Sequence, residues 1–135
     1  MRVLFMCVAN SARSQMAEGL ARGLLNEKVE IQSAGSFPSH VHPLAVRALE
    51  KRGMNTEGQR SKSIQTIDPE TVDIVITLCQ EEVCPTVFGE KKRLRWPMPD
   101  PSRGARNEEE ALEQFCQIRD EIEKKIREEF GDYLS

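Results

Sequence analysis

The chain has 135 residues, of which 39% are hydrophobic and 30% charged, and its formal net charge is −3. This length suits one hydrophobic core, so we expect a single domain over residues 1–135. The acidic balance excludes a broad basic surface for nucleic acid. The sequence has neither an apolar run of membrane-spanning length nor a start that resembles a signal peptide. We therefore expect a cytoplasmic protein without nucleic-acid or membrane partners.

Predicted strands and helices alternate along the chain. Short apolar runs typical of buried parallel strands lie at 2–7, 29–35, 72–78 and, more weakly, 93–98. Helical periodicity is found at 14–25, 43–53 and about 107–130. This order predicts an α/β fold with a doubly wound, four-stranded parallel sheet flanked by helices. In the first helix the polar half of the wheel predicts that Glu18, Arg22 and Asn26 face water.

Three of the predicted strands are followed by residues that can carry chemistry. Cys7 ends the first strand, Cys79 follows the third, and Asp100 follows the fourth. In open α/β sheets, ligands bind beyond the carboxyl ends of the strands. We therefore expect the functional site at this edge of the sheet.

The stretch "CVANSARS" leads from the first strand into the first helix. Backbone N–H groups at a helix start form an anion site, and the same dipole favours the thiolate of Cys7. Arg13 can hold an oxyanion through two parallel hydrogen bonds, and Asn10 tolerates a left-handed turn. The predicted oxyanion-binding residues are Val8, Ala9, Asn10, Ser11, Ala12, Arg13 and Ser14. The spacing alone also fits a buried cysteine followed by a surface arginine.

The stretch "WPMPDPSRG" holds Asp100 between two prolines. A carboxyl group that faces an anion site has a raised pKa, because the neighbouring negative charge disfavours its ionised form. Such a group suits general-acid catalysis. The alternative is a turn aspartate that caps the following helix.

Cys79 and Cys84 lie five positions apart in "LCQEEVCP". On an unbroken helix this spacing separates them by about 7.5 Å along the axis, too far for a disulfide. A redox pair therefore requires a segment that is non-helical or unwinds on oxidation, and we expect a mobile redox loop at about 79–92. The alternative is two buried structural cysteines. Cys116, on the flank of the last helix, is expected to be a structural thiol.

Together these motifs resemble a known family. "CVANSARS" resembles the phosphate-binding loop of the low-molecular-weight protein tyrosine phosphatase superfamily, and "RSQMAEG" is similar to its arsenate reductase branch, which takes electrons from thioredoxin. The resemblance extends over essentially the whole chain. It includes "SAG" at 33–35, "HPLA" at 42–45, "DIVITLC" at 73–79 and "DP" at 100–101.

The resemblance implies reduction of arsenate to arsenite, in arsenic detoxification, through three thiols. Cys7 attacks arsenate, and Cys79 then attacks Cys7, so that arsenite leaves as a disulfide forms. Cys84 next attacks Cys79, which gives a disulfide that thioredoxin or a similar dithiol reduces. In this scheme Arg13 binds the oxyanion, Asp100 is the general acid, and no cofactor is needed.

Two other functions use the same residues. A phosphatase acting on phosphotyrosine or small aryl phosphates shares Cys7, Arg13 and Asp100 but needs neither Cys79 nor Cys84. Phosphatases of this family usually carry aromatic residues after the Asp-Pro, where this chain has "SRG". The third interpretation is a non-catalytic protein whose thiols bind zinc or sense oxidants, although no familiar Cys-x2-Cys spacing is present.

The resemblance also concerns a metal ion. Some reductases of this family hold potassium near the loop, and Asn10, Glu18 and Ser33 match three of its ligands. Lys62 falls about where the fourth, an aspartate, would lie, so its ammonium could replace the ion. We predict no required metal. His40 and His42 are expected to be structural.

Overall fold

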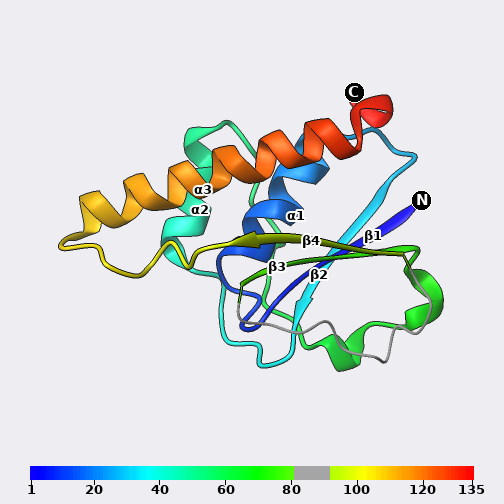
Figure 1. Ribbon diagram of the computed structural model, residues 1–135, viewed down its shortest axis with the longest axis horizontal. Helices are drawn as coiled ribbons and strands as arrows, with labels where there is room; N and C mark the ends of the chain where they lie inside the picture. Colours follow the sequence, from blue (N-terminus) through cyan, green and yellow to red (C-terminus); the bar gives the residue numbers. More distant parts are fainter. Residues whose placement is uncertain (81–91) are drawn as a thin grey trace.

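The computed structural model describes residues 1–80 and 92–135 (Figure 1). Its four strands form one parallel sheet in the order β2-β1-β3-β4. The strands are β1 (Arg2–Cys7), β2 (Glu30–Gly35), β3 (Ile74–Cys79) and β4 (Lys92–Met98). The helices are α1 (Arg13–Leu24), α2 (Pro43–Lys51) and α3 (Glu108–Glu129). The predicted α/β fold with a four-stranded parallel sheet is confirmed.

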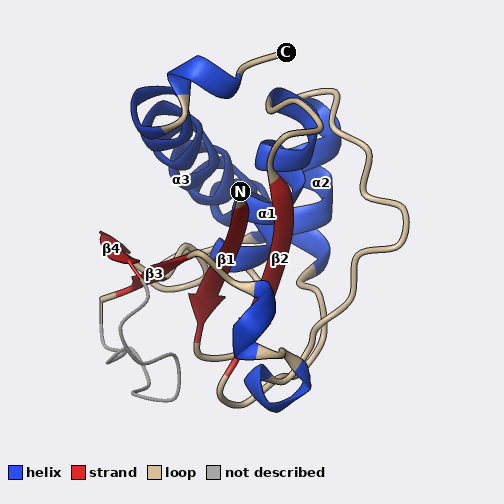
Figure 2. Ribbon diagram, turned by 90° about the vertical axis from the view of Figure 1, so that its right-hand side faces the viewer, coloured by secondary structure: helices blue, strands red, loops and turns tan. Residues whose placement is uncertain are grey.

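The two central strands, β1 and β3, are buried on both faces, as their continuous apolar runs predicted, whereas the edge strand β4 is largely exposed. In β1, Val3 and Phe5 pack with the helices, whereas Leu4 and Met6 belong to a second cluster on the opposite face. The three α-helices pack against one another and gather on one face (Figure 2). The segment around the short 3-10 helices η1 (Ile64–Thr66) and η2 (Pro69–Thr71) covers the other, where Ile64 completes the smaller cluster.

The starts of the helices follow from their caps. The ring nitrogen of His42 accepts the Leu44 N–H at the start of α2, and Asn107 accepts the Glu110 N–H at the start of α3. α1 differs, because its N-cap residue is Ala12, whose side chain makes no capping bond. The first N–H groups of α1 therefore face the loop that follows Cys7 without a side-chain cap.

The strand register sets the position of the site. Met6 pairs with Thr77, and Cys79 pairs with Met98 after an irregularity in β3. The carboxyl ends of β1, β3 and β4 therefore meet at one edge of the sheet, as predicted. None of the described helices is long and apolar enough to cross a membrane.

Candidate active site

The loop between β1 and α1 is held from outside by its carbonyl groups. Asn10 has a φ of 46°, the left-handed conformation predicted for it. The carbonyls of Val8, Ala9 and Ser11 accept backbone N–H groups of the 37–42 segment at 2.8, 3.2 and 3.0 Å. In a trans peptide the next N–H points the opposite way, so the N–H groups of Ala9 and Ala12 lie on the inner side of the loop. This arrangement suits an anion.

Gly35 supports the same loop from behind. A Cβ at this position would lie 2.5 Å from the Val8 carbonyl oxygen, 2.7 Å from the Asn10 nitrogen and 2.8 Å from the Cys7 carbonyl oxygen. Only glycine lets the end of β2 approach the loop this closely. The "SAG" motif carried this information, but reasoning from the sequence assigned Gly35 no role in the site.

Beside this loop lies a pocket of about 440 Å³. It brings together Cys7, Arg13 and Asp100, which were predicted as catalytic from two separate parts of the sequence. Of the predicted oxyanion-binding residues, Asn10 and Ser14 are fully buried and do not line it. The pocket is lined by Cys7, Val8, Ala9, Ser11, Ala12, Arg13, Ser39, His42, Asp100, Ser102 and Arg103.

Cys7 is buried at the base of this pocket, with 3% of its surface exposed. Its pKa is lowered from 9.0 to about 6, chiefly by a hydrogen bond from Cys79. Ser14, whose Oγ lies 2.9 Å from the Cys7 sulfur, and the charge of Arg13 act in the same direction, whereas burial opposes them. Cys7 is therefore largely a thiolate at neutral pH.

Among the described residues, Cys79 is the thiol that acts most strongly on the pKa of Cys7. It is 1% exposed, and its sulfur accepts the Val8 N–H at 3.1 Å. The pKa of Cys79 is strongly raised, because its proton is held in the hydrogen bond to Cys7 and because the group is buried. The pair therefore consists of a thiolate at Cys7 and a thiol at Cys79.

Arg13 and Asp100 also line the pocket. Arg13 is 7% exposed, and its guanidinium donates to the Met98 carbonyl at 2.8 Å. Asp100 accepts the backbone N–H and hydroxyl of Ser102 at 2.9 and 2.7 Å and so forms a turn, but the helix that follows is capped by Asn107 and not by Asp100. Arg103 lies 3.6 Å from its second oxygen.

The pKa of Asp100 differs from the sequence-based expectation. Partial burial alone would raise it, but the Ser102 hydrogen bonds and the positive charges of Arg13 and Arg103 outweigh that effect, and the pKa is lowered. The sequence predicted a raised pKa from a neighbouring anion, whereas the chain's own hydrogen bonds and cations lower the pKa of Asp100.

Comparison with known proteins places this geometry in a family. The family model of low molecular weight phosphotyrosine protein phosphatases matches residues 2–132. The chain belongs to this family. An arsenate reductase of Halalkalibacterium halodurans is 36% identical over 127 residues, which cover 93% of this chain and 91% of that protein.

Solved structures extend the similarity to three dimensions. An arsenate reductase in its phosphate-binding state has a TM-score of 0.78 and 29% identity, with 98% of each chain covered. A thioredoxin-dependent arsenate reductase of Corynebacterium glutamicum has a TM-score of 0.72 and 32% identity, covering 97% of this chain and 60% of that one. The predicted membership of the phosphatase family and the resemblance to its arsenate reductases are confirmed.

The residues matched to the family's potassium ligands meet behind the loop. Contrary to the prediction that Glu18 faces water, its side chain is 1% exposed. It accepts the Ser33 hydroxyl at 2.6 Å and the Lys62 ammonium at 3.4 Å, and Arg22 lies 3.7 Å away. The helical period gave the wrong side because a buried ion pair, rather than solvent, satisfies this carboxylate. Asn10 Oδ1 accepts the backbone N–H of Lys62 at 2.8 Å.

The other predicted residues have these positions. Cys84, with the rest of 81–91, lies outside the described residues. Cys116 is half-buried against the core, as a structural thiol would be. His42 caps α2, with its ring 4.7 Å from Phe115, and it also lines the pocket. Within the described ranges, no three histidine, cysteine or acidic residues are grouped closely enough to hold a metal ion.

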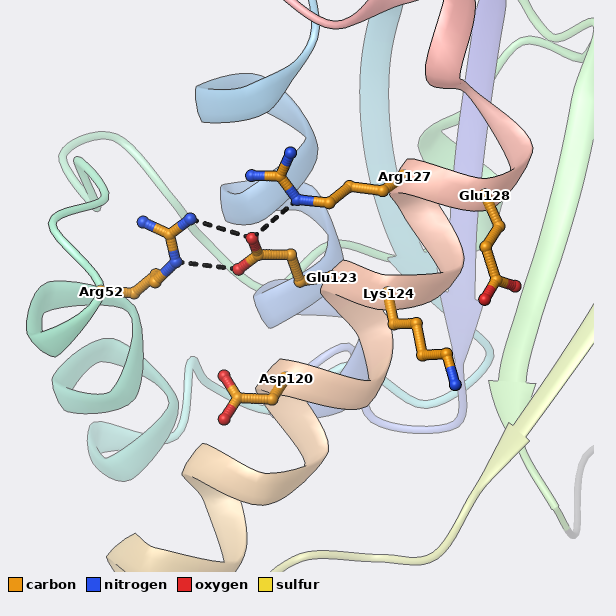
Figure 3. A pocket seen from close by; sticks show the side chains of 6 residues that line it. All are labelled: Arg52, Asp120, Glu123, Lys124, Arg127 and Glu128. Carbon is orange, nitrogen blue, oxygen red and sulfur yellow. Dashed lines mark hydrogen bonds and ion pairs between the residues drawn. The ribbon is translucent and has the colours of Figure 1, made fainter.

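A larger hollow, of about 560 Å³, lies between the end of α2 and the outer face of α3 (Figure 3). Three of its charged side chains are paired with one another: Glu123 accepts two bonds from Arg52, both at 2.9 Å, and one from Arg127 at 2.9 Å. It contains no cysteine or histidine and none of the predicted site residues. The smaller pocket beside Cys7 is therefore the candidate active site.

Proposed function

We propose that this protein is an arsenate reductase in which Cys7 attacks arsenate and Cys79 then forms a disulfide with Cys7, so that arsenic is reduced. The observation that carries the proposal is the buried position of Cys79 beside the loop, where its sulfur accepts the Val8 N–H at 3.1 Å and where each thiol is the largest influence on the pKa of the other. A phosphatase has no use for a second thiol at this point. Relatives of similar length and fold that are arsenate reductases support the same reaction.

The first step forms a bond between sulfur and arsenic. Arsenate binds against the inner N–H groups of the loop and the Arg13 guanidinium. The Cys7 thiolate attacks arsenic, and one arsenic–oxygen bond breaks, its oxygen leaving as water with a proton from Asp100. The negative charge of arsenate raises the pKa of Asp100 and opposes the cations of the pocket, so substrate binding favours the protonated acid.

The second step reduces arsenic. Cys79 attacks the Cys7 sulfur, a sulfur–sulfur bond forms, and the sulfur–arsenic electron pair stays on arsenic. Arsenic(V) becomes arsenic(III) while two thiols become a disulfide, so the electrons balance. Cys79 must first lose its proton. Once Cys7 carries arsenic it is no longer a thiolate, and the largest cause of the raised pKa of Cys79 is removed.

The third step restores Cys7. Cys84 attacks the Cys79 sulfur, releases the Cys7 thiolate and leaves a disulfide between Cys79 and Cys84. Support for Cys84 comes from its spacing in the sequence, because it lies outside the described residues. A dithiol protein of the thioredoxin type then supplies two electrons, as a thioredoxin-dependent relative of the same fold suggests. No cofactor or metal enters these steps.

A phosphatase is the second candidate, and the shared family together with the Cys7, Arg13 and Asp100 arrangement supports it. In that reaction water would hydrolyse a phosphorylated Cys7. The described pocket wall after Asp100 consists of Ser102 and Arg103, and among the described residues no phenylalanine, tyrosine or tryptophan lines the pocket. This composition does not favour a phosphotyrosine ring.

Two assays on one pair of variants separate the candidates. Arsenate reduction with thioredoxin and hydrolysis of para-nitrophenyl phosphate would be measured in wild type, Cys79→Ser and the control Cys116→Ser. We expect Cys79→Ser to lose arsenate reduction and to keep phosphatase activity, with Cys116→Ser unaffected in both. Arsenate reduction that survives in Cys79→Ser rules out the relay. A wild type that hydrolyses the phosphate ester but does not reduce arsenate is a phosphatase.

A further inference from the structure

A buried chain of hydrogen bonds runs from the loop after α2 to the Cys7 sulfur. Gln59 Nε2 donates to Gln15 Oε1 at 3.0 Å, and Gln15 Nε2 donates to Asn10 Oδ1 at 3.0 Å. Asn10 Nδ2 then donates to Ser14 Oγ at 2.8 Å, and this oxygen lies 2.9 Å from Cys7 Sγ. Gln15 and Gln59 do not line the pocket of Cys7.

The backbone fixes the orientation of each amide in this chain. Asn10 Oδ1 also accepts the backbone N–H of Lys62 at 2.8 Å, and an N–H can only donate, so the amide nitrogen must face Ser14. Gln15 Nε2 also faces two carbonyls, those of Asn10 at 3.0 Å and Arg60 at 2.8 Å. Gln59 Nε2 faces the Gln15 carbonyl at 2.9 Å. No amide can therefore be turned around without placing like groups together.

These orientations decide which atom of the last pair donates. Ser14 Oγ receives a hydrogen from Asn10, so the hydroxyl's own hydrogen is left for the Cys7 sulfur. Every bond then points the same way, with the positive end of each dipole toward Cys7, and such chains strengthen one another. The chain starts at the amide of Gln59, which donates to Gln15 on the side away from the sulfur.

We propose that Gln15 and Gln59 are positioning residues for Cys7, which hold a one-directional hydrogen-bond chain that ends on its sulfur. They act through Asn10 and Ser14 and stabilise the thiolate without touching substrate. The proposal rests on the proposed role of Cys7 as the nucleophile. Its test measures the thiolate itself and does not depend on which substrate the enzyme uses.

Other titratable and charged groups also face Cys7 and remain unchanged in the test. They belong to α1, to β3 and to the loops before α2 and after β4. The end of β2 contributes only an uncharged glycine. These groups are Arg13, Cys79, His42, Asp100 and Arg103. Behind the loop, the Glu18–Lys62 ion pair is also retained. A shift caused by Gln59 or Gln15 variants is therefore attributable to the chain of amides.

The experiment compares Gln59→Leu and Gln15→Met with wild type and with Gln65→Leu, a control at an exposed glutamine. The rate of Cys7 alkylation by iodoacetamide is measured against pH, with the modified peptide identified by mass spectrometry. We expect Gln15→Met to shift the profile upward by about one pH unit, a tenfold lower rate on the acidic side. Gln59→Leu, one step further away, should lower that rate about twofold to threefold. The rate at high pH should be unchanged, and Gln65→Leu should match wild type.

Circular dichroism and thermal unfolding check that each variant is folded. If Gln15→Met does not fold, Gln59→Leu decides the question, because Gln59 lies in a loop and is only half-buried. A Gln59→Leu profile that superimposes on wild type overturns the proposal. A rate lowered equally at every pH also overturns it, since that result indicates general disruption. Absence of arsenate reduction in wild type would refute the proposed function and leave the alkylation result standing.

Discussion

The pocket beside Cys7 and the hollow between α2 and α3 differ in how their charges are satisfied. In the larger hollow, the Glu123 carboxylate is bound by two guanidinium groups and has its charge fully compensated. In the smaller pocket, the Cys7 thiolate is held mainly by neutral donors, the Cys79 thiol and the Ser14 hydroxyl. A thiolate held by neutral donors keeps its charge and can attack an electrophile. The comparison shows that an anionic side chain held mainly by neutral donors marks the site better than the volume of a cavity does.

The largest effect is expected for the aspartate of the smaller pocket, and an aspartate of the hollow is its control. Asp100→Asn keeps an oxygen for the Ser102 bonds but cannot protonate a leaving oxygen, so we expect kcat to fall about 10²- to 10³-fold. Asp120→Asn, in the hollow, should leave kcat unchanged. Steady-state arsenate reduction checks both variants. Equal activities for Asp100→Asn and wild type would show that Asp100 is only a turn residue.

The pH dependence provides the next contrast. The thiolate is the reactive form of Cys7 and its pKa is lowered to about 6, so activity should be present above this pH and lost below it. We expect kcat/KM for para-nitrophenyl phosphate to fall about tenfold per pH unit on the acidic side. Cys79→Ala removes the largest cause of the lowered pKa and should move this fall to higher pH. Glu123→Gln should not move it; a profile that is the same in Cys79→Ala and wild type contradicts the coupling of the two thiols.

Glycine substitutions compare the support of the loop with an open surface. Gly35→Ala forces a Cβ against three backbone atoms of the 7–10 loop and should destabilise the protein by about 1–3 kcal/mol. Gly131→Ala meets no atom within 4 Å and should leave stability nearly unchanged. Urea unfolding measures both variants. Gly35→Ala should also lower the activity of the folded protein, because the loop must shift; full stability and activity would show that the loop yields without cost.

The smallest effect is expected in the hollow. Glu123→Gln weakens the bonds from Arg52 and Arg127 and should cost about 0.5–1.5 kcal/mol, because the pair is partly exposed. The pKa of Glu123 is lowered, chiefly by the Arg52 hydrogen bond, so its contribution is present above its ordinary value of 4.5 and is lost as pH falls through the lowered pKa. Urea unfolding at neutral and acidic pH should show the difference between variant and wild type shrinking in acid. A difference that is constant with pH would contradict the charge-based origin.

The fold and most of the site could be predicted because they depend on local patterns. The β1 run is apolar at every buried position, so its type and bounds followed from the sequence. Cys7 and Asp100 were found because each stands at or just after a strand end, and parallel strands bring those ends together. Arg13 was found from its place at the end of the loop that follows Cys7. The asparagine at position 10 also indicated its own left-handed conformation.

The errors concern residues whose environment is made by distant parts of the chain. The period of α1 placed Glu18 toward water, but Ser33 and Lys62, remote in sequence, bury and bind it. For Asp100 the sequence indicated only the effect of a bound anion, whereas the structure adds the chain's own cations and Ser102, which lower its pKa. Gln15 drew no attention, since its partners Asn10, Gln59 and Arg60 meet it only in the folded protein.

The sequence by itself determined the order of strands and helices, the edge of the sheet at which the candidate site lies, and the proposal of Cys7 as the nucleophile beside an oxyanion-binding loop. These follow from hydrophobic periodicity and from the residue types at strand ends, which are local properties. Only the tertiary structure decided that Cys79 keeps its proton while Cys7 loses its own. It also decided that Gly35 supports the loop and that the amides of Gln59 and Gln15 point toward the sulfur. Hydrogen-bond direction and burial depend on which distant groups are brought within about 3 Å, and no local pattern specifies that.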